Sequence, residues 1–155
     1  MTPAINIAKK ANIIYKIHEY SHETSNESYG LEASEKMGVD KTRVFKTIVI
    51  ILDSKEFAVG IIPVSSMLSM KLIAKALKVK KANMATPDDV QRSTGYVIGG
   101  VSPFGQKKRL KTIIDSSAQN FTSIYVSAGR RGLEIELHPD DLKKLTNATF
   151  ADVCQ

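Results

Sequence analysis

The sequence predicts an α+β fold built on a mainly antiparallel, curved or barrel-like sheet with surrounding helices. Two observations support this class. Segments rich in isoleucine and valine recur along the chain, and several follow one another after short turns, as the strands of hairpins do. Between them lie segments with the capping residues and apolar spacing of helices. Because no repeat or linker interrupts the 155 residues, we expect a single domain over residues 1–155.

The first forty residues predict two helices and one strand. Thr2-Pro3 combines a capping side chain with a proline that suits the first helical turn. The alternation of side chains over residues 15–20 is typical of a strand. Residues 21–30 are polar and turn-like, and residues 31–37 predict a short helix that Gly38 ends.

The next fifty residues predict a hairpin, a helix and a short strand. Residues 44–52 and 57–64 are rich in β-branched side chains, and residues 53–55 form the turn between them. Residues 69–77 predict a helix with a serine cap, apolar residues on one face and lysines on the other. A short strand is expected at residues 81–85.

The C-terminal part predicts a glycine-rich loop among helices and further strands. Thr86-Pro87 opens a helix that ends near Gly95. Residues 95–105 hold four of the nine glycines and predict a shaped loop. Strands are expected at 110–115, 122–127, 132–137 and 150–153, with a last helix that opens at Pro139.

Composition narrows the class of protein. The longest apolar runs are far shorter than the roughly 20 residues that a membrane-spanning helix needs. The single cysteine excludes a disulfide framework and a zinc finger. The first residues lack the pattern of a signal peptide, so we expect a cytoplasmic protein without a membrane partner.

The positive charge is concentrated in the middle of the chain. Residues 57–114 hold ten lysines or arginines and two acids, whereas the rest of the chain holds twelve and fourteen. A field of this kind suits a polyanionic partner such as a nucleic acid. A solvated lysine-rich face explains the same charges, so charge alone leaves both interpretations open.

Two motifs resemble known metal and nucleotide sites but fall short of them. Residues 18–22 match the H-E-x-x-H pattern of zinc proteases, yet their predicted strand would separate the two histidines by about 13 Å. Residues 100–107 resemble a phosphate-binding loop, but the lysine comes one residue late and no Ser or Thr follows it. We therefore expect no metal and no cofactor.

Lys46 is the unusual residue of the apolar strand predicted at 44–52. Strand alternation places it on the same face as Ile48 and Ile50. A lysine on a buried face must extend to solvent, pair with an acid or serve a site. From these residues alone, a strand-end lysine that reaches solvent explains the pattern as well as a functional one.

Three longer motifs resemble those of one family. They are Arg-Val-Phe-Lys-Thr at 43–47 before a hydrophobic strand, the glycine-rich stretch at 93–109, and Ile-Tyr-Val-Ser-Ala-Gly-Arg-Arg-Gly-Leu-Glu-Ile at 124–135. Together with residues 1–4 and 150–152, these motifs span the chain in order and resemble the YbaK/EbsC family.

The resemblance implies an aminoacyl-tRNA deacylase that acts in trans with prolyl-tRNA synthetase. Its substrate would be mischarged tRNA(Pro), chiefly cysteinyl-tRNA(Pro), and the substrate's own thiol would attack the ester. The implied catalytic residues are Lys46, Gly99 and Gly100, and the implied substrate-binding residues are Tyr20, Tyr29, Thr47, Ser127 and Glu134. The chain departs from the family pattern at Ala128, where glycine is usual, and at Glu134, where aspartate or another polar residue often stands; both positions bear on pocket width.

Physical chemistry is compatible with this role. A proline-charging site discriminates poorly against a smaller side chain, so a second hydrolytic site is the remedy. Glycines at 99 and 100 would let backbone N–H groups approach the ester oxygen. Lys46, protonated at its ordinary pKa, would anchor the ribose or phosphate of the terminal adenosine, whereas strong desolvation of the ammonium would favour a general base instead. The competing interpretation is a non-catalytic module that binds aminoacyl-tRNA or a synthetase on the same fold.

Overall fold

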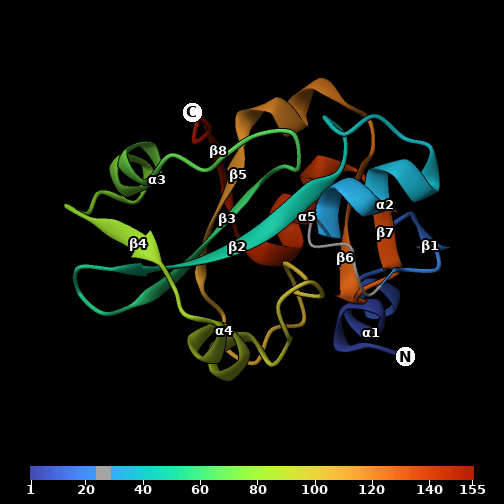
Figure 1. Cartoon of the computed structure of the whole chain (residues 1–155), viewed down its shortest axis with the longest axis horizontal. Helices are drawn as coiled ribbons and strands as arrows, with labels where there is room; N and C mark the ends of the chain where they lie inside the picture. The colour runs from blue at the N-terminus through green and yellow to red at the C-terminus, as the bar shows by residue number, and fades with distance from the viewer. Residues whose placement is uncertain (24–28) are drawn as a thin grey trace.

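The computed structural model describes residues 1–23 and 29–155, which form an α+β fold with two sheets (Figure 1). The smaller sheet has the strand order β1-β7-β6, and both of its pairings are antiparallel. Its strands are β1 (Tyr15–Glu19), β6 (Ile124–Arg130) and β7 (Leu133–Leu137).

The larger sheet has five strands in the order β4-β2-β3-β5-β8. The central hairpin strand β2 is antiparallel to β3 and β4, whereas β5 is parallel to β3 and β8. Its strands are β2 (Phe45–Leu52), β3 (Phe57–Pro63), β4 (Ala82–Met84), β5 (Lys111–Asp115) and β8 (Thr149–Ala151).

The mainly antiparallel α+β fold that the sequence predicts is confirmed, but the sheet is not a closed barrel. The described strands form two separate sheets that meet at an isolated parallel bridge between Val44 and Tyr125. A single bridge leaves the neighbouring edge of β2 without a strand partner, so the sheets cannot close on each other there.

Helices surround the two sheets (Figure 1). The predicted caps are present: the side chains of Thr2, Ser69 and Thr86 each accept a hydrogen bond from the backbone N–H three residues later. The described helices are α1 (Pro3–Lys10), α2 (Tyr29–Met37), α3 (Met70–Leu77), α4 (Pro87–Thr94), α5 (Pro139–Thr146) and a 3₁₀ helix over Ser116–Asn120. None of these helices is long and apolar enough to cross a membrane.

The largest difference from the predicted elements concerns residues 21–30. Helix α2 begins at Tyr29, inside the segment predicted as a turn, and residues 24–28 of that segment lie outside the described residues. Gly30 allows this early start, because a Cβ there would lie 2.3 Å from Cγ1 of Val64. The early start brings Tyr29 onto an ordered helix.

Strand β2 separates two hydrophobic clusters. Phe45 and Val49 belong to the cluster that also holds the inner residues of the smaller sheet. Ile48 and Ile50 belong to the second cluster, against α3. This alternation confirms the predicted orientation of the side chains on β2. It puts Lys46 on the side of the second cluster.

Candidate functional site

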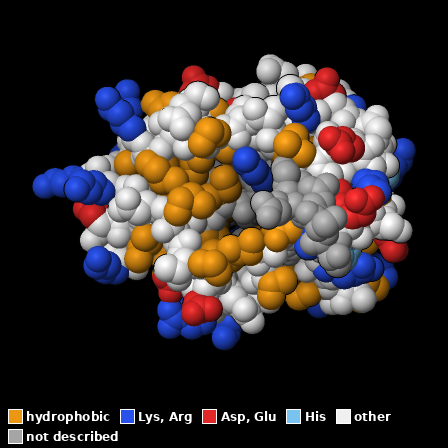
Figure 2. Space-filling view, viewed as in Figure 1, with side chains coloured by type: hydrophobic (Ala, Val, Ile, Leu, Met, Phe, Trp, Pro, Cys, Tyr) orange, Lys and Arg blue, Asp and Glu red, His pale blue; other side chains and the backbone are white. Residues whose placement is uncertain are grey.

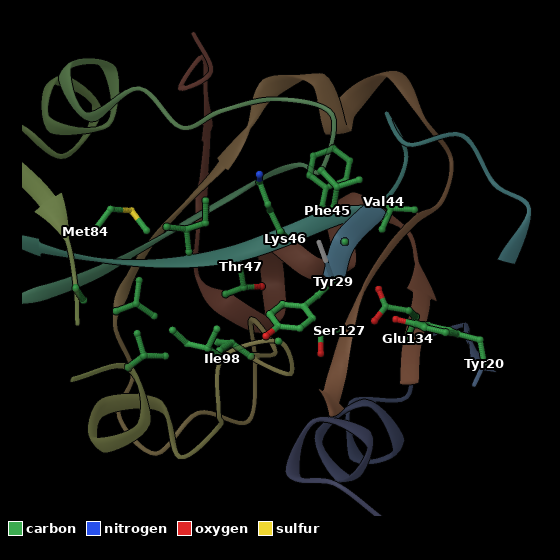
Figure 3. Close-up of a pocket in the computed structure, with 18 residues that line it drawn as sticks. Tyr20, Tyr29, Val44, Phe45, Lys46, Thr47, Met84, Ile98, Ser127 and Glu134 are labelled. Carbon is green, nitrogen blue, oxygen red and sulfur yellow. The ribbon is translucent and has the colours of Figure 1, made fainter. Parts of the chain in front are cut away.

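A pocket of about 340 Å³ lies along the unpaired edge of β2, between the two sheets. Figure 2 shows the hollow from outside, bordered by hydrophobic side chains with a basic side chain beside it. Figure 3 shows that its lining comes from β2, α2, the glycine loop and the smaller sheet. Residues distant in sequence therefore meet at one cavity.

Seven of the eight predicted site residues line this pocket. Lys46 and Thr47 come from β2, and the others come from elements that face it. The seven are Tyr20, Tyr29, Lys46, Thr47, Gly99, Ser127 and Glu134. The sequence thus predicted a set of residues that the fold brings together, although their chemical roles remain predictions.

Gly100 has a different position from the one predicted, and it does not line the pocket. Its N–H donates to the carbonyl oxygen of Val97 at 2.9 Å, so this donor is engaged within a turn. A Cβ at residue 100 would lie 2.7 Å from Cα of Arg130, so glycine is needed for close packing. Of the two glycines, Gly99 is the one that lines the pocket, and its backbone contact with a substrate stays a prediction.

Lys46 lies half-buried at the pocket, and its side chain leaves β2 on the side opposite to Thr47 (Figure 3). Burial lowers the pKa of its ammonium, and the neighbouring Cys154 acts in the opposite direction. Among the described residues, no carboxylate forms an ion pair with Lys46. Its charge is therefore available to an anionic or strongly polar ligand.

Cys154 is tied to the second cluster, close to Lys46. It forms an isolated bridge with Leu68 and is half-buried. Burial, and then the charge of Asp115, raise the pKa of its thiol to about 12. The thiol is consequently neutral at physiological pH, and it is not among the groups that line the pocket.

The end of the pocket at the smaller sheet is polar. Ser127 and Glu134 are partners across β6 and β7, and Tyr20 lies beside them (Figure 3). Glu134 is only 6% exposed, and burial raises its pKa to about 8. A carboxyl group in this state keeps its proton at neutral pH and can donate a hydrogen bond as well as accept one.

Arg131 packs against two residues that line the pocket, and the sequence analysis assigned it no role. Its guanidinium lies 4.1 Å from the centre of the Tyr29 ring and 4.0 Å from Oε1 of buried Glu32. A Cβ at Gly99 would lie 3.0 Å from Cδ of Arg131. Arg131 thus joins α2 to the glycine loop. No pattern in the sequence distinguishes it from Arg130, because its partners are distant in the chain.

Only the first two residues of the zinc-protease pattern at 18–22 lie on strand β1. His18 lies on the predicted strand, and its Nε2 is 2.9 Å from Oε1 of Glu136. In the described part of the chain, no group of three or more His, Cys, Asp or Glu side chains could hold a metal ion. The strand predicted for the motif is present at its first two residues, and β1 ends before His22.

The comparison with known protein families supports the same kind of function as the residues of the pocket. The family model described as an aminoacyl-tRNA editing domain matches residues 27–145, which covers most of the chain. The chain belongs to the YbaK/EbsC family of aminoacyl-tRNA editing domains.

Relatives of this editing domain cover it almost end to end. An Enterococcus faecalis protein, EbsC, provisionally named a Cys-tRNA(Pro)/Cys-tRNA(Cys) deacylase, is 37% identical over 98% of this chain and 92% of its own. Solved structures share the fold: a hypothetical protein, APE2540, has a TM-score of 0.88 at 21% identity and covers 99% of each chain. A protein provisionally described as a trans-editing enzyme for prolyl-tRNA synthetase has a TM-score of 0.83 at 20% identity, covering 100% of this chain and 99% of its own.

The two departures from the YbaK/EbsC pattern fall in different environments. Ala128 is fully buried in the first hydrophobic cluster and is not among the residues that line the pocket. Glu134 does line the pocket, at its polar end. Of the two positions, only Glu134 contributes to the lining of the pocket in this editing domain.

Proposed function

We propose that this editing domain deacylates mischarged Cys-tRNA(Pro) in trans. The observation that supports the proposal best is the gathering of Lys46, Thr47, Gly99, Ser127 and Glu134 at one pocket. A polar end and a nearby cation suit an aminoacyl ester with an amino group and a ribose. The name of the 37% identical relative supports cysteine as the amino acid that is esterified to the tRNA.

The proposed chemistry uses the thiol of the substrate. Among the described residues that line the pocket there is no histidine or cysteine that could supply a nucleophile–base pair. The cysteinyl sulfur attacks its own carbonyl carbon, the ester C–O bond breaks, and the thiol proton passes to the departing ribose oxygen. The product is a cyclic thiolactone, which makes the step lyase-like; water as the nucleophile makes it a hydrolysis.

Lys46 acts in this scheme as an electrostatic anchor. Its pKa is lowered by burial from a value near 10.5, and we propose that it remains protonated and holds the ribose or phosphate next to the ester. The buried carboxyl of Glu134, with its pKa near 8, then faces the amino acid as a neutral hydrogen-bonding group.

The proposed partners are tRNA(Pro) and prolyl-tRNA synthetase, in the cytoplasm. Helix α3 presents Lys71 and Lys75 beyond its buried face, and residues 107–111 add four further cations. Side chains of this kind contact phosphates without reading bases, so binding to the acceptor stem would be salt-sensitive. The name of the trans-editing structure supports the synthetase as partner.

The experiment that tests this function compares three esters on one tRNA(Pro): cysteinyl, alanyl and seryl. A strong preference for the cysteinyl ester supports attack by the substrate thiol. Comparable rates for the three esters indicate attack by water and a broader editing activity. Salt-dependent tRNA binding without faster loss of any ester would contradict the deacylase and favour a non-catalytic binding module.

A further inference from the structure

The last three residues of the chain are held like a strand, although chain ends usually fray. The N–H of Ser69 donates to the carbonyl oxygen of Val153 at 2.8 Å. The N–H of Gln155 donates to the carbonyl oxygen of Met67 at 3.0 Å, and an isolated antiparallel bridge lies between these two bonds. We call residues 153–155 the C-terminal tail, and Figure 1 shows the C-terminus beside the loop that leads into α3. The tail is therefore a fixed part of the fold.

A buried carboxylate holds this tail from the neighbouring strand. Asp115 ends β5 and is 6% exposed. Its Oδ1 accepts from the N–H of Val153 at 3.0 Å, and its Oδ2 accepts from the N–H of Ser117 at 3.2 Å and from the Ser117 hydroxyl. A carboxylate is costly to bury unless donors satisfy its oxygens, and these three donors do so. Asp115 does not line the pocket, and the proposed ester chemistry does not use it.

The tail lies on the same side of β2 as the Lys46 side chain. Lys46 is the partner of Ile62 on β3, and Ile62 belongs to the second hydrophobic cluster. Val153 is fully buried in that cluster, and Cys154 packs against it. Among the described titratable groups, Cys154 is the one whose proximity affects the pKa of Lys46. The tail therefore contributes to the burial of this lysine.

Packing has to fix the direction of the Lys46 side chain, because no described carboxylate forms an ion pair with it. A lysine stem is long and flexible, and holding it in one position costs rotamer entropy. A neighbour that is itself fixed limits this freedom already in the free protein. The tail is such a neighbour, because its backbone is hydrogen-bonded both to the loop before α3 and to Asp115.

We propose that the C-terminal tail, fixed by Asp115, positions the Lys46 ammonium at the pocket. Asp115 and Cys154 are then positioning residues, which act through Lys46 and do not touch the substrate. The proposal rests on the proposed function, because Lys46 anchors the ester end only in that scheme. If the tail served stability alone, its release would lower the melting temperature and leave the titration of Lys46 unchanged.

The first test compares Asp115→Asn with Asp152→Asn. Both substitutions change a carboxylate to an amide, but exposed Asp152 accepts from the Ser116 hydroxyl and precedes the tail. Acetic anhydride acetylates only the unprotonated amine, so labelling over a pH series, followed by peptide mass spectrometry, gives the titration of each lysine. Release of the tail removes part of the burial that lowers the pKa of Lys46, so in Asp115→Asn its titration should move up by about half a pH unit. Asp152→Asn should match the wild type.

Deacylation kinetics give the functional readout for the same pair. We expect Asp115→Asn to lose about tenfold in kcat/KM for Cys-tRNA(Pro), mainly through KM, because a displaced anchoring group holds the substrate less well. Asp152→Asn should keep the wild-type constants. A folded Asp115→Asn protein with the wild-type titration of Lys46 overturns the proposal, whatever its kcat/KM.

A second pair of variants tests the contact without removing the Asp115 carboxylate. Cys154→Lys adds a cation beside Lys46, and like charges disfavour the charged form, so the titration of Lys46 should move down. Gln155→Lys adds the same charge at the next, exposed residue, whose side chain points to the opposite side of a strand, so Lys46 should keep its wild-type titration. Equal shifts in both variants, or no shift in either, would overturn the proposal.

These outcomes are separable from those of the proposed function. If the wild-type protein deacylates Cys-tRNA(Pro) but the titration of Lys46 does not respond to the variants of the tail and of Asp115, the positioning role is wrong and the deacylase stands. If the titration responds but the wild-type protein deacylates no ester, the contact of the tail with Lys46 stands and the deacylase is wrong.

Discussion

Arg131 joins the pocket residues Tyr29 and Gly99, and its removal should act on substrate binding. Arg131→Met keeps an unbranched stem against Gly99 but loses the cation over the Tyr29 ring at 4.1 Å. A contact of this kind is worth about 1 kcal/mol, so we expect a several-fold rise in KM for Cys-tRNA(Pro) with a small change in kcat. Steady-state kinetics on the charged tRNA measure this.

Arg130→Met is the matched control for that variant. Arg130 is exposed and pairs with exposed Glu19 at 3.8 Å, an arrangement that contributes little free energy. The KM of the Arg130→Met protein for Cys-tRNA(Pro) should stay near the wild-type value. Equal kinetic effects from both substitutions would contradict a positioning role for Arg131.

Glu134 gives the protein a pH dependence of stability with a definite sign. The folded protein keeps the Glu134 proton up to a pKa of about 8, whereas the unfolded chain releases it near 4.5. The folded state therefore binds more protons in this window, and the free energy of unfolding should fall as pH rises from about 4.5 to 8.

Denaturant unfolding of wild type and Glu134→Gln at several pH values measures this effect. The amide does not titrate, so the decline in stability with pH should be smaller in the variant. Glu19→Gln, which changes an exposed strand carboxylate, should keep the wild-type decline. An unchanged slope in Glu134→Gln would show that the carboxyl is not buried as described.

A single site residue could be predicted from the sequence where a charged side chain interrupts the apolar pattern of a strand. Lys46 stands out because a lysine interrupts an apolar strand, and its partners on the pocket follow from the family motifs. Arg131 and buried Glu32 could not be recognised in this way. Their burial comes from contacts between α2 and the β6–β7 turn, and both residues look like ordinary surface charges in the sequence.

At the level of elements, the position of α2 depends on the missing side chain of Gly30. Gly30→Ala would place Cβ 2.3 Å from Cγ1 of Val64, so either α2 or β3's end must shift. Overpacking of this kind costs about 1–3 kcal/mol. We expect a lower melting temperature and reduced deacylation, since Tyr29 begins the same helix.

Glu35→Ala provides the control for Gly30→Ala. Glu35 is exposed on α2, and alanine there favours the helix. Its melting temperature and activity should match the wild type, as measured by thermal unfolding and deacylation. A Gly30→Ala protein as stable as Glu35→Ala would contradict the close packing of α2 on Val64.

Local sequence predicted the elements better than their pairing. The β2–β3 hairpin and the capped helices follow from short-range patterns, and the structure has them near the predicted residues. The parallel pairing of β5 with β3 and β8 joins strands far apart in the chain, so no local pattern indicates it. The start of α2 was missed because Tyr29-Gly30 has the composition of a turn.

At the level of the whole molecule, each of the two sheets contributes part of the pocket. The larger sheet carries Lys46 and the open edge of β2, the smaller sheet carries Ser127 and Glu134, and the pocket lies between them. The predicted charge surplus of residues 57–114 belongs mainly to the larger sheet and its helices. Under the proposed function, a tRNA acceptor end along this side would reach both sheets with its terminal ester.

The most direct test of this account is deacylation of Cys-tRNA(Pro) by wild type, Lys46→Ala and Lys16→Ala. Lys16 is an exposed strand lysine on β1 outside the pocket, so its variant should retain wild-type activity. Lys46→Ala should lose at least about 100-fold in kcat/KM while it stays folded, because the cation that anchors the ester end is gone. Wild-type activity in a folded Lys46→Ala protein would contradict the assignment of this pocket as the deacylase site.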